Sequence, residues 1–286
     1  MKPSSFEYCL PKTIEEAFAA LDHDDAKIIA GGQSLVPMMN FRLVQPGRLV
    51  DINSLPGLGE IVLDGGTMRI GSLVRHAEAA RHDLVRNHLP VIAEAMAHVA
   101  HVAIRNRGTI GGSLVHADPS AEWPLLVTLL DGQIEIAGPE GLRHAAPQEF
   151  FVAPLVTTIE DDEILVAVRL PILSPGTGMA FTEIAQRAGD FAVVAAAATV
   201  LMDRGVISDV RLALGGAGDV PVRLFEVEAA LAGLRPDAID AITRGCADGL
   251  EPNEDMHATA EYRRSLIPVL ARRALEAAVQ RAGAMR

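Results

Sequence analysis

Two glycine pairs with a serine close behind are the first features whose residue types and spacing could do chemistry. They are Gly31-Gly32, followed by Ser34, and Gly111-Gly112, followed by Ser113, and each comes after a short apolar stretch. Because glycine has no Cβ, a Gly-Gly step lets a ligand approach the backbone closely, and inward-pointing N–H groups near a helix start bind anions. Two such loops could cradle a diphosphate, although a Gly-Gly pair is more often an ordinary turn.

Neither loop has a common nucleotide signature. The G-x-G-x-x-G fingerprint of dinucleotide-binding Rossmann folds is missing at both, and so is the G-x-x-x-x-G-K-[ST] pattern that supplies a lysine and a Mg²⁺ ligand. The sequence therefore gives no support for a Rossmann fold or for nucleoside triphosphatase chemistry.

Two carboxylates four residues apart, Asp118 and Glu122, follow the second glycine pair. Carboxylates repel a phosphate, so these two side chains would need a different role. A flavin ring has an N3–H group from which a carboxylate can accept a hydrogen bond. The other interpretation is that a helix starts here and carries acidic residues in its first turn, where the helix dipole stabilises negative charge. Both interpretations remain open at this point.

The histidines and cysteines do not form a recognisable metal site. His98 and His101 are three apart on an expected helix, but no third ligand can be named, so structural roles are favoured. The two cysteines, Cys9 and Cys246, are far apart, whereas an iron–sulfur cluster typically takes four thiolates and a structural zinc site takes paired ligands. No G-x-S-x-G elbow and no evident general base is present, so no catalytic residue is assigned.

Alternating helices and strands are expected to position these residues. Periodicity predicts helices over residues 13–21, 89–102 and 125–130, and strands over 27–30, 48–52, 68–73, 133–137 and 163–170. Two prolines and two glycines within residues 171–178 indicate a boundary. Beyond it come predicted strands over 179–184, 192–202 and 206–215, then helices over 224–231, 236–246 and 260–281. Strands followed by helices favour an α+β second domain.

Length and composition exclude several classes of protein. A chain of 286 residues suggests about two domains. The net charge of −12 disfavours binding to nucleic acid, and no uncharged apolar run reaches the roughly 18 residues of a membrane span. The start of the chain lacks the apolar core of a signal peptide, so we expect a cytoplasmic protein.

Charge is unevenly distributed along the chain. Residues 256–286 contain six arginines and two glutamates, a net charge of +4. This segment is either a solvated helix face that complements the acidic remainder or a contact for a partner subunit.

Several segments together resemble the FAD-binding medium subunit of the molybdenum hydroxylases, the carbon monoxide dehydrogenase and xanthine dehydrogenase family. They are residues 30–37 (AGGQSLVP), 48–52 (RLVDI) and 104–113 (IRNRGTIGGS), with 187–192 (RAGDFA) and parts of 257–275 beyond the boundary. The resemblance covers nearly the whole chain.

The resemblance implies an α+β fold and a place in a larger assembly. The expected fold is a vanillyl-alcohol-oxidase-type FAD-binding domain over 1–174, with subdomains of about 1–56 and 57–174, then a smaller α+β C-terminal domain over 178–286. The implied partners are a large molybdenum-cofactor subunit and a small [2Fe–2S] subunit in a dimer of heterotrimers. The chain would pass electrons from the clusters, through FAD, to an external acceptor.

The resemblance also implies site residues. The diphosphate and ribityl chain of FAD would contact Ala30, Gly31, Gly32, Gln33, Ser34, Leu35, Thr109, Ile110, Gly111, Gly112 and Ser113. Glu122, where relatives commonly have Asp, would bond the edge of the flavin ring, and Asp118 would support the ribityl chain. His101 would lie near the adenosine or diphosphate part, Ile164 and Leu165 would pack on the cofactor, and Phe191 would cover the ring. Gln33 replaces a residue that is often His in carbon monoxide dehydrogenase itself.

Two other functions remain as alternatives. One is a self-contained FAD-dependent oxidase or dehydrogenase, for which His116 is the candidate attachment or acid–base residue. The other is a non-catalytic nucleotide-binding assembly module.

Overall fold

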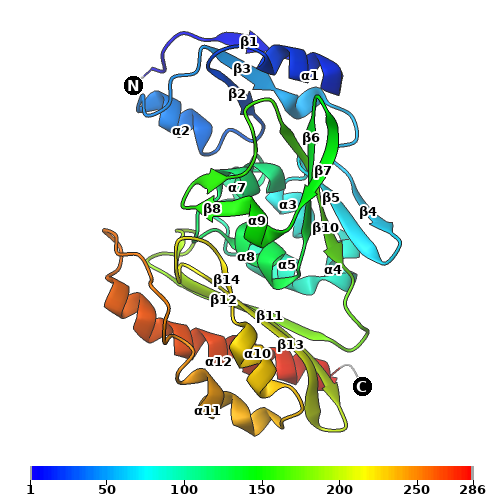
Figure 1. The fold of residues 1–286 in the computed structure, drawn as a ribbon, viewed down its shortest axis with the longest axis vertical. Coiled ribbons are helices and arrows are strands. Elements are labelled where there is room, and N and C mark those ends of the chain that lie inside the picture. The colour runs from blue at the N-terminus through cyan, green and yellow to red at the C-terminus, as the bar shows by residue number, and fades with distance from the viewer. Residues whose placement is uncertain (1, 285–286) are drawn as a thin grey trace.

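The three larger β-sheets of the described residues follow one another along the long axis of the molecule (Figure 1). The computed structural model describes residues 2–284, so Met1, Met285 and Arg286 lie outside the described part of the chain. Helices cover or separate the sheets, and the α+β fold predicted from the sequence is confirmed. None of the helices in the described residues is long and apolar enough to cross a membrane.

The first sheet is parallel, has the strand order β1-β3-β2, and carries helices α1 and α2. Its elements are β1 (Glu7–Cys9), α1 (Ile14–Leu21), β2 (Ala26–Ile29), α2 (Leu35–Asn40) and β3 (Arg48–Asp51), followed by the 3-10 turn η1 (Ile52–Ser54). Thr13 caps α1 by accepting from the Glu16 N–H at 3.2 Å, and the helix buries Ala17 and Leu21.

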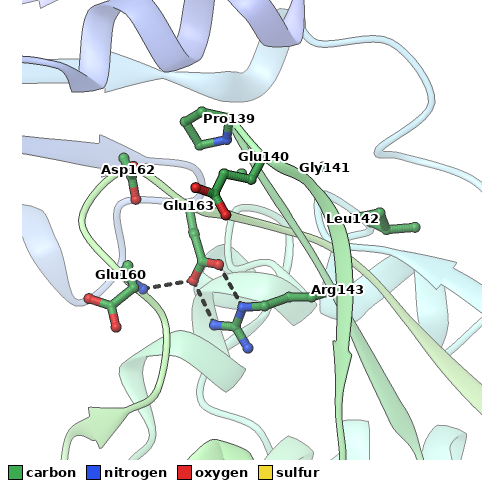
Figure 2. A pocket seen from close by; sticks show the side chains of 9 residues that line it. Pro139, Glu140, Gly141, Leu142, Arg143, Glu160, Asp162 and Glu163 are labelled. Carbon is green, nitrogen blue, oxygen red and sulfur yellow. Dashed lines mark hydrogen bonds and ion pairs between the residues drawn. The ribbon is translucent and has the colours of Figure 1, made fainter.

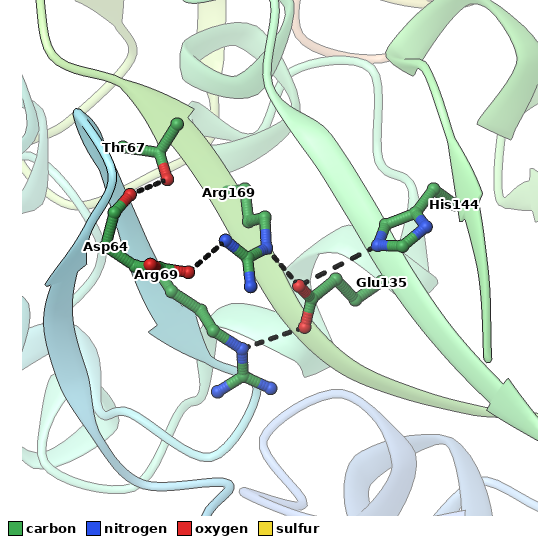
Figure 3. A network of polar contacts seen from close by, with 6 residues as sticks. All are labelled: Asp64, Thr67, Arg69, Glu135, His144 and Arg169. Atoms are coloured by element: carbon green, nitrogen blue, oxygen red, sulfur yellow. Dashed lines mark hydrogen bonds and ion pairs between the residues drawn. The ribbon is translucent and has the colours of Figure 1, made fainter.

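The second sheet is antiparallel and has the strand order β4-β5-β10-β6-β7. These strands are β4 (Ile61–Asp64), β5 (Thr67–Gly71), β6 (Gln133–Gly138), β7 (Gly141–Ala145) and β10 (Ile164–Pro171). A network of charged side chains crosses the sheet (Figure 3): Glu135 accepts from Arg69 at 2.8 Å and from Arg169, which also pairs with Asp64 at 2.7 Å. These cross-strand pairs stabilise the register of the central strands.

A group of short helices covers the face of the second sheet that is opposite the charged network. They are α3 (His76–Ala79), α4 (Asp83–His88), α5 (Pro90–Met96), α6 (Val102–Arg105), α7 (Ile110–His116), α8 (Glu122–Leu129) and α9 (Pro147–Phe150), with the hairpin β8 (Phe151–Ala153) and β9 (Val156–Thr157) beside them. Every residue of α8 is buried, because this helix also packs against the third sheet. Trp123, Leu126 and Met68 are among the fully buried side chains of this core.

The third sheet lies between α12 on one side and α5 and α8 on the other. It has the order β11-β12-β13-β14, and its elements are β11 (Gly178–Ala185), β12 (Ala192–Asp203), β13 (Val206–Gly215), β14 (Val222–Arg223), α10 (Phe225–Leu231), η2 (Pro236–Ala238), α11 (Ile239–Thr243) and α12 (Ala260–Ala284). Along β12, Ala195 and Ala197 face the core shared with α8, whereas Ala196 and Ala198 face α12. Small residues on both faces let the helices pack closely.

Two expected elements differ from the structure. The helix predicted over 89–102 ends at Met96, and residues 97–101 form a turn in which Ala100 has a φ of 40°. Arg105 stabilises that turn by donating to the carbonyls of Val99 and Ala100 at 2.7 and 2.6 Å. His98 and His101 therefore do not share a helix face. The helix predicted over 236–246 is likewise shorter, since it is divided into η2 and α11.

The arginines of the C-terminal segment mostly pair with acidic residues of the same chain. Arg263 pairs with Asp255 at 2.6 Å, Arg281 with Glu94 at 2.6 Å, and Arg272 lies 3.7 Å from Asp240. Arg286, which the sequence count includes, lies outside the described residues. Two of these pairs lie within the C-terminal domain, as the first interpretation expects, whereas Arg281 reaches Glu94 of the FAD-binding part.

Candidate functional site

The two glycine loops lie directly against each other, although they are far apart in the sequence. A Cβ on Gly31 would lie 2.9 Å from Gly108 Cα and closer still to the Arg107 carbonyl oxygen. Real Cβ atoms do not approach backbone so closely, so Gly31 allows the first loop to touch the segment that leads into the second. The structure thus brings the two motifs into one surface.

A chain of hydrogen bonds holds the two loops in register. Asn53, just after β3, donates to the Ala30 carbonyl at 2.9 Å and accepts from Arg75 at 2.6 Å. Arg75 also donates to the Arg107 carbonyl. Sequence reasoning missed Asn53 and Arg75, because neither belongs to a motif and their partners are distant in the sequence.

The first loop presents free backbone donors. Among the described residues, the N–H groups of Gly31, Gly32, Gln33 and Ser34 have no protein acceptor within hydrogen-bonding distance. Gly32 has a φ of 69°, a conformation that suits glycine and bends successive N–H groups toward one side. Free N–H groups in such a turn are what an anion-binding loop needs, so the expectation from the sequence stays a prediction for this loop.

The second loop differs from that expectation, because its glycines lie in the first turn of α7. The N–H groups of Ile110 and Gly111 donate to the Val74 and Ser72 carbonyls at 3.1 and 2.9 Å. Thr109 caps the helix by accepting from Gly112 at 3.1 Å. The N–H of Ser113 donates to the Thr109 carbonyl at 3.0 Å. The Ile110–Ser113 stretch therefore has no free N–H for a phosphate, and what it can offer a ligand is the Ser113 hydroxyl.

Glycine at position 111 is required by the packing of the protein itself. A Cβ there would lie 2.6 Å from the Cβ of Ser72. Gly111 thus fixes α7 against the strand edge rather than opening space for a ligand.

Positive charge is concentrated beside the loops. Burial and the like charge of Arg107 lower the pKa of Arg75, with Asp51 and Glu78 opposing them. His76 accepts a hydrogen bond from the Trp123 indole at 3.0 Å, and burial, followed by Arg75 and Arg105, lowers its pKa to about 4. The imidazole is therefore neutral at pH 7. Mutual repulsion among these arginines would be relieved by a bound anion.

The two carboxylates follow α7, as the sequence order requires. Ala117, with a φ of 51°, ends that helix, and Asp118 accepts from the Ser120 N–H at 2.9 Å. Glu122 begins α8 and is 5% exposed. Burial raises the pKa of Glu122 to about 8, with further contributions from Glu183 and Asp118. Glu122 therefore holds a proton at neutral pH and can both donate and accept.

His101 and Phe191 lie on two loops that touch each other. A Cβ on Gly189 would lie 3.0 Å from the Ala100 carbonyl, so the 186–191 loop packs against residues 97–101. Both His101 and Phe191 are exposed. His116, the last residue of α7, makes no side-chain contact among the described residues that would support an attachment or acid–base role.

Ile164 and Leu165 are not brought to the surface of the loops. Ile164 is 1% exposed in the core beneath the first sheet, and Leu165 is 4% exposed in the core of the second. Their side chains already pack inside the protein, so the structure gives no direct sign of the cofactor contact expected from the sequence.

A hollow of about 430 Å³ lies under the β6–β7 hairpin (Figure 2). Glu163 in its wall accepts from Arg143 twice at 2.6 Å and from the Glu160 N–H at 2.9 Å. Glu140 and Asp162 add further carboxylates, which disfavour a phosphate there. No His, Cys, Asp and Glu cluster with metal-binding geometry occurs in the described part of the chain.

Residues 4–173 match the family model described as the FAD binding domain in molybdopterin dehydrogenase, and residues 179–278 match that of the CO dehydrogenase flavoprotein C-terminal domain. The chain belongs to the FAD-binding medium subunits of the molybdenum hydroxylases. Its cofactor is FAD, and it is a subunit of an oxidoreductase. The free donors of the first loop and the neighbouring arginines fit the FAD diphosphate.

Several relatives align with this chain over almost the whole length of both sequences. The 6-hydroxypseudooxynicotine dehydrogenase complex subunit alpha of Paenarthrobacter nicotinovorans is 41% identical, over 99% of this chain and 97% of the relative. The carbon monoxide dehydrogenase medium chain of Hydrogenophaga pseudoflava is 34% identical, over 97% and 98%. Quinoline 2-oxidoreductase from Pseudomonas putida 86 superposes with a TM-score of 0.94 at 37% identity, over 100% of both chains.

Proposed function

We propose that this chain is the FAD-carrying electron-transfer subunit of a molybdenum-dependent hydroxylase or dehydrogenase. The observation that carries the proposal is the pair of touching loops, with four free N–H groups on one and Arg75 and Arg107 beside the other. This combination suits a dianionic diphosphate linked to a larger group.

Each part of the site has a defined task in this proposal. The Gly31–Ser34 backbone binds the diphosphate, and the hydroxyls of Ser34 and Ser113 add donors. Glu122 hydrogen-bonds the edge of the flavin ring and Asp118 supports the ribityl chain. His101 and Phe191, on their two touching loops, flank the cofactor, Phe191 over the ring. When bound, FAD accepts electrons singly and passes them on singly or in pairs.

The electrons come from a partner chain in this proposal. Cys9 and Cys246 are the chain's two cysteines, they lie in different parts of the fold, and burial raises the pKa of Cys246 to about 11. A [2Fe–2S] cluster therefore has no ligand set here. We place the cluster in a small subunit and the molybdenum cofactor in a large one, and relatives named as medium chains and complex subunits support a multi-subunit assembly. We further propose that the assembly is a dimer of heterotrimers.

We also propose the division of the chain used in the sequence analysis. The FAD-binding domain covers 1–174, with subdomains of about 1–56 and 57–174, and the C-terminal domain covers 178–286. Sheet membership supports this division, since no sheet combines strands of β1 to β3, of β4 to β10 and of β11 to β14.

A reconstitution experiment tests the proposal. The chain is expressed alone, incubated with FAD, desalted and examined by absorption spectroscopy, and we expect flavin bands at about one FAD per chain. The complex purified from its native source should also contain iron and molybdenum, and its FAD should be reduced when the molybdenum subunit receives substrate. Absence of flavin after reconstitution, or a flavin that stays oxidised in the complex, would refute electron transfer through this subunit.

A further inference from the structure

Three ionisable side chains lie where the FAD-binding part packs against the third sheet: His98 and Glu183 are in contact, and the charge of Glu183 acts on Glu122. Glu122 starts α8, Glu183 lies on β11, and His98 lies in the turn after α5. His98 Nδ1 is 3.0 Å from Glu183 Oε1, and the His98 ring packs on Phe181 with centroids 5.4 Å apart. The Glu183 side chain is 5% exposed whereas that of His98 is 39% exposed, so the imidazole connects a buried carboxyl with solvent.

The buried carboxyls of this group lack the partners that buried carboxyls have elsewhere in the chain. Glu183 Oε2 is fully buried without a hydrogen-bond partner, and the Glu122 carboxyl meets its own backbone N–H but no cation or other side chain that bonds it among the described residues. In contrast, the buried Glu228 accepts from Arg223 and from the Leu212 N–H at 2.7 Å. Unpaired buried carboxyls destabilise a fold, so their presence here calls for a functional explanation.

Protonation follows from these surroundings. Burial raises the pKa of Glu183, with His98 opposing it, and burial raises that of Glu122 to about 8, with Glu183 and Asp118 adding to the shift. Glu122 thus carries a proton at the inner end of the group, where the proposed function puts the flavin.

We propose that His98, Glu183 and Glu122 form a proton path from solvent to the flavin. The inference rests on the proposed function. Electrons that reach a buried cofactor from the iron–sulfur partner leave uncompensated negative charge, which is costly in a medium of low dielectric constant. Proton uptake along the path removes this charge.

The steps balance for each proton. His98 takes a proton from water at Nε2 and gives its Nδ1 proton to Glu183 Oε1, Glu183 passes a proton from Oε2 to Glu122, and Glu122 gives its own to the cofactor. One proton enters the path and one leaves it. Afterwards His98 carries its proton at Nε2 instead of Nδ1, and a flip of its ring, together with rotation of the Glu183 carboxyl group, resets the path. No direct hydrogen bond joins Glu183 to Glu122 among the described residues, so the proposal requires a water molecule between the two carboxyl groups.

Proton uptake by the FAD-loaded chain tests the inference directly. The protein is reduced rapidly by dithionite in weakly buffered solution, and a pH-indicator dye follows the proton uptake while flavin absorbance follows the electrons. We expect His98→Gln and Glu183→Gln to slow proton uptake at least tenfold with the FAD content unchanged. Added imidazole should restore the rate of His98→Gln and leave that of Glu183→Gln slow.

The chain offers a closely matched control in His144. This histidine also faces a buried glutamate, Glu135, at 3.8 Å, and the two side chains are 38% and 3% exposed. Because Glu135 pairs with two arginines of the second sheet and with no residue of the proposed path, His144→Gln should take up protons at the wild-type rate.

A second measurement does not need the flavin. Infrared spectra of the FAD-free chain at pH 6.5 should contain a buried protonated-carboxyl band that is absent from Glu122→Gln. Unchanged proton uptake in FAD-loaded His98→Gln and Glu183→Gln, or no such band, would overturn the proton path and leave the proposed function intact. A wild-type chain that binds no FAD would refute both the proton path and the proposed function.

Discussion

The buried carboxyls of this protein differ in what neutralises them. Burial alone would raise the pKa of Glu135, but hydrogen bonds from Arg169 and Arg69 outweigh it and lower the value (Figure 3). Glu122 also has little exposed surface, but it lies deeper in the protein and has no cation beside it, so burial prevails and its pKa rises. At this scale, the presence of a charged partner decides whether a buried acid is ionised or neutral.

The raised pKa of Glu122 predicts a loss of stability with increasing pH. Its folded value of about 8 lies above the ordinary 4.5, so the unfolded chain releases this proton first and the folded state is penalised as pH rises from about 4.5 to 8. In the FAD-free chain this amounts to on the order of 4 kcal/mol. Urea unfolding at pH 5 and pH 8.5 should show the loss in wild type and a much smaller one in Glu122→Gln.

Glu60→Gln is the control for this experiment, because Glu60 is exposed. It should follow the wild-type pH dependence. Equal pH dependence in Glu122→Gln and wild type would mean that Glu122 is ionised in the folded state.

Single residues show how far the sequence could predict the site. The glycine pairs, Asp118 and Glu122 were identified because their types and spacing are local. Asn53, Arg75 and the His98–Glu183 pair were not, since their roles arise from contacts between distant segments. No local pattern records such a contact.

Whole elements were predicted where local preference and packing agree. The long strands of the third sheet matched their apolar runs. The Gly111-Gly112 helix was not expected, because glycine disfavours helices by about 1 kcal/mol per residue. Here the Thr109 cap and the bonds to Ser72 and Val74 overcome that preference.

The contact between the two glycine loops predicts a specific effect on FAD binding. In Gly31→Ala, the added methyl group would collide with the backbone of residues 107 and 108 and push the loops apart. We expect the FAD dissociation constant, measured by flavin fluorescence quenching, to rise at least about tenfold, which corresponds to roughly 1.4 kcal/mol.

Gly59→Ala is the matched control, because a Cβ at Gly59 has no atom within 4 Å and its backbone needs no positive φ. It should bind FAD like wild type. If Gly31→Ala also bound FAD normally, the contact between the loops would have no part in the cofactor site.

At the scale of the whole molecule, the third sheet shares one core with the second sheet and its helices and a second core with α12. Met179 and Phe181 of β11 lie in the core of the FAD-binding part, whereas Ala180 lies in the core with α12. Sequence periodicity predicted the strands but not this double burial, because an apolar run does not specify which surfaces cover it. One cooperative unfolding transition is expected from a shared core.

Glu94 of α5 is the polar link across this junction and provides the test. It accepts from the Phe181 N–H at 3.1 Å and pairs with Arg281 of α12 at 2.6 Å. The ion pair is partly exposed and contributes little to the free energy of unfolding, so the hydrogen bond to the Phe181 N–H is the larger contribution of Glu94. We expect Glu94→Ala to lower the free energy of unfolding by about 1–3 kcal/mol, because it leaves that N–H unpaired, and Glu94→Gln to lower it by less.

Fluorescence of Trp123, the only tryptophan, reports on the FAD-binding part, and far-ultraviolet circular dichroism reports on the whole chain. The two urea transitions should coincide in wild type and in both variants, and separate transitions in wild type would show that the parts unfold independently.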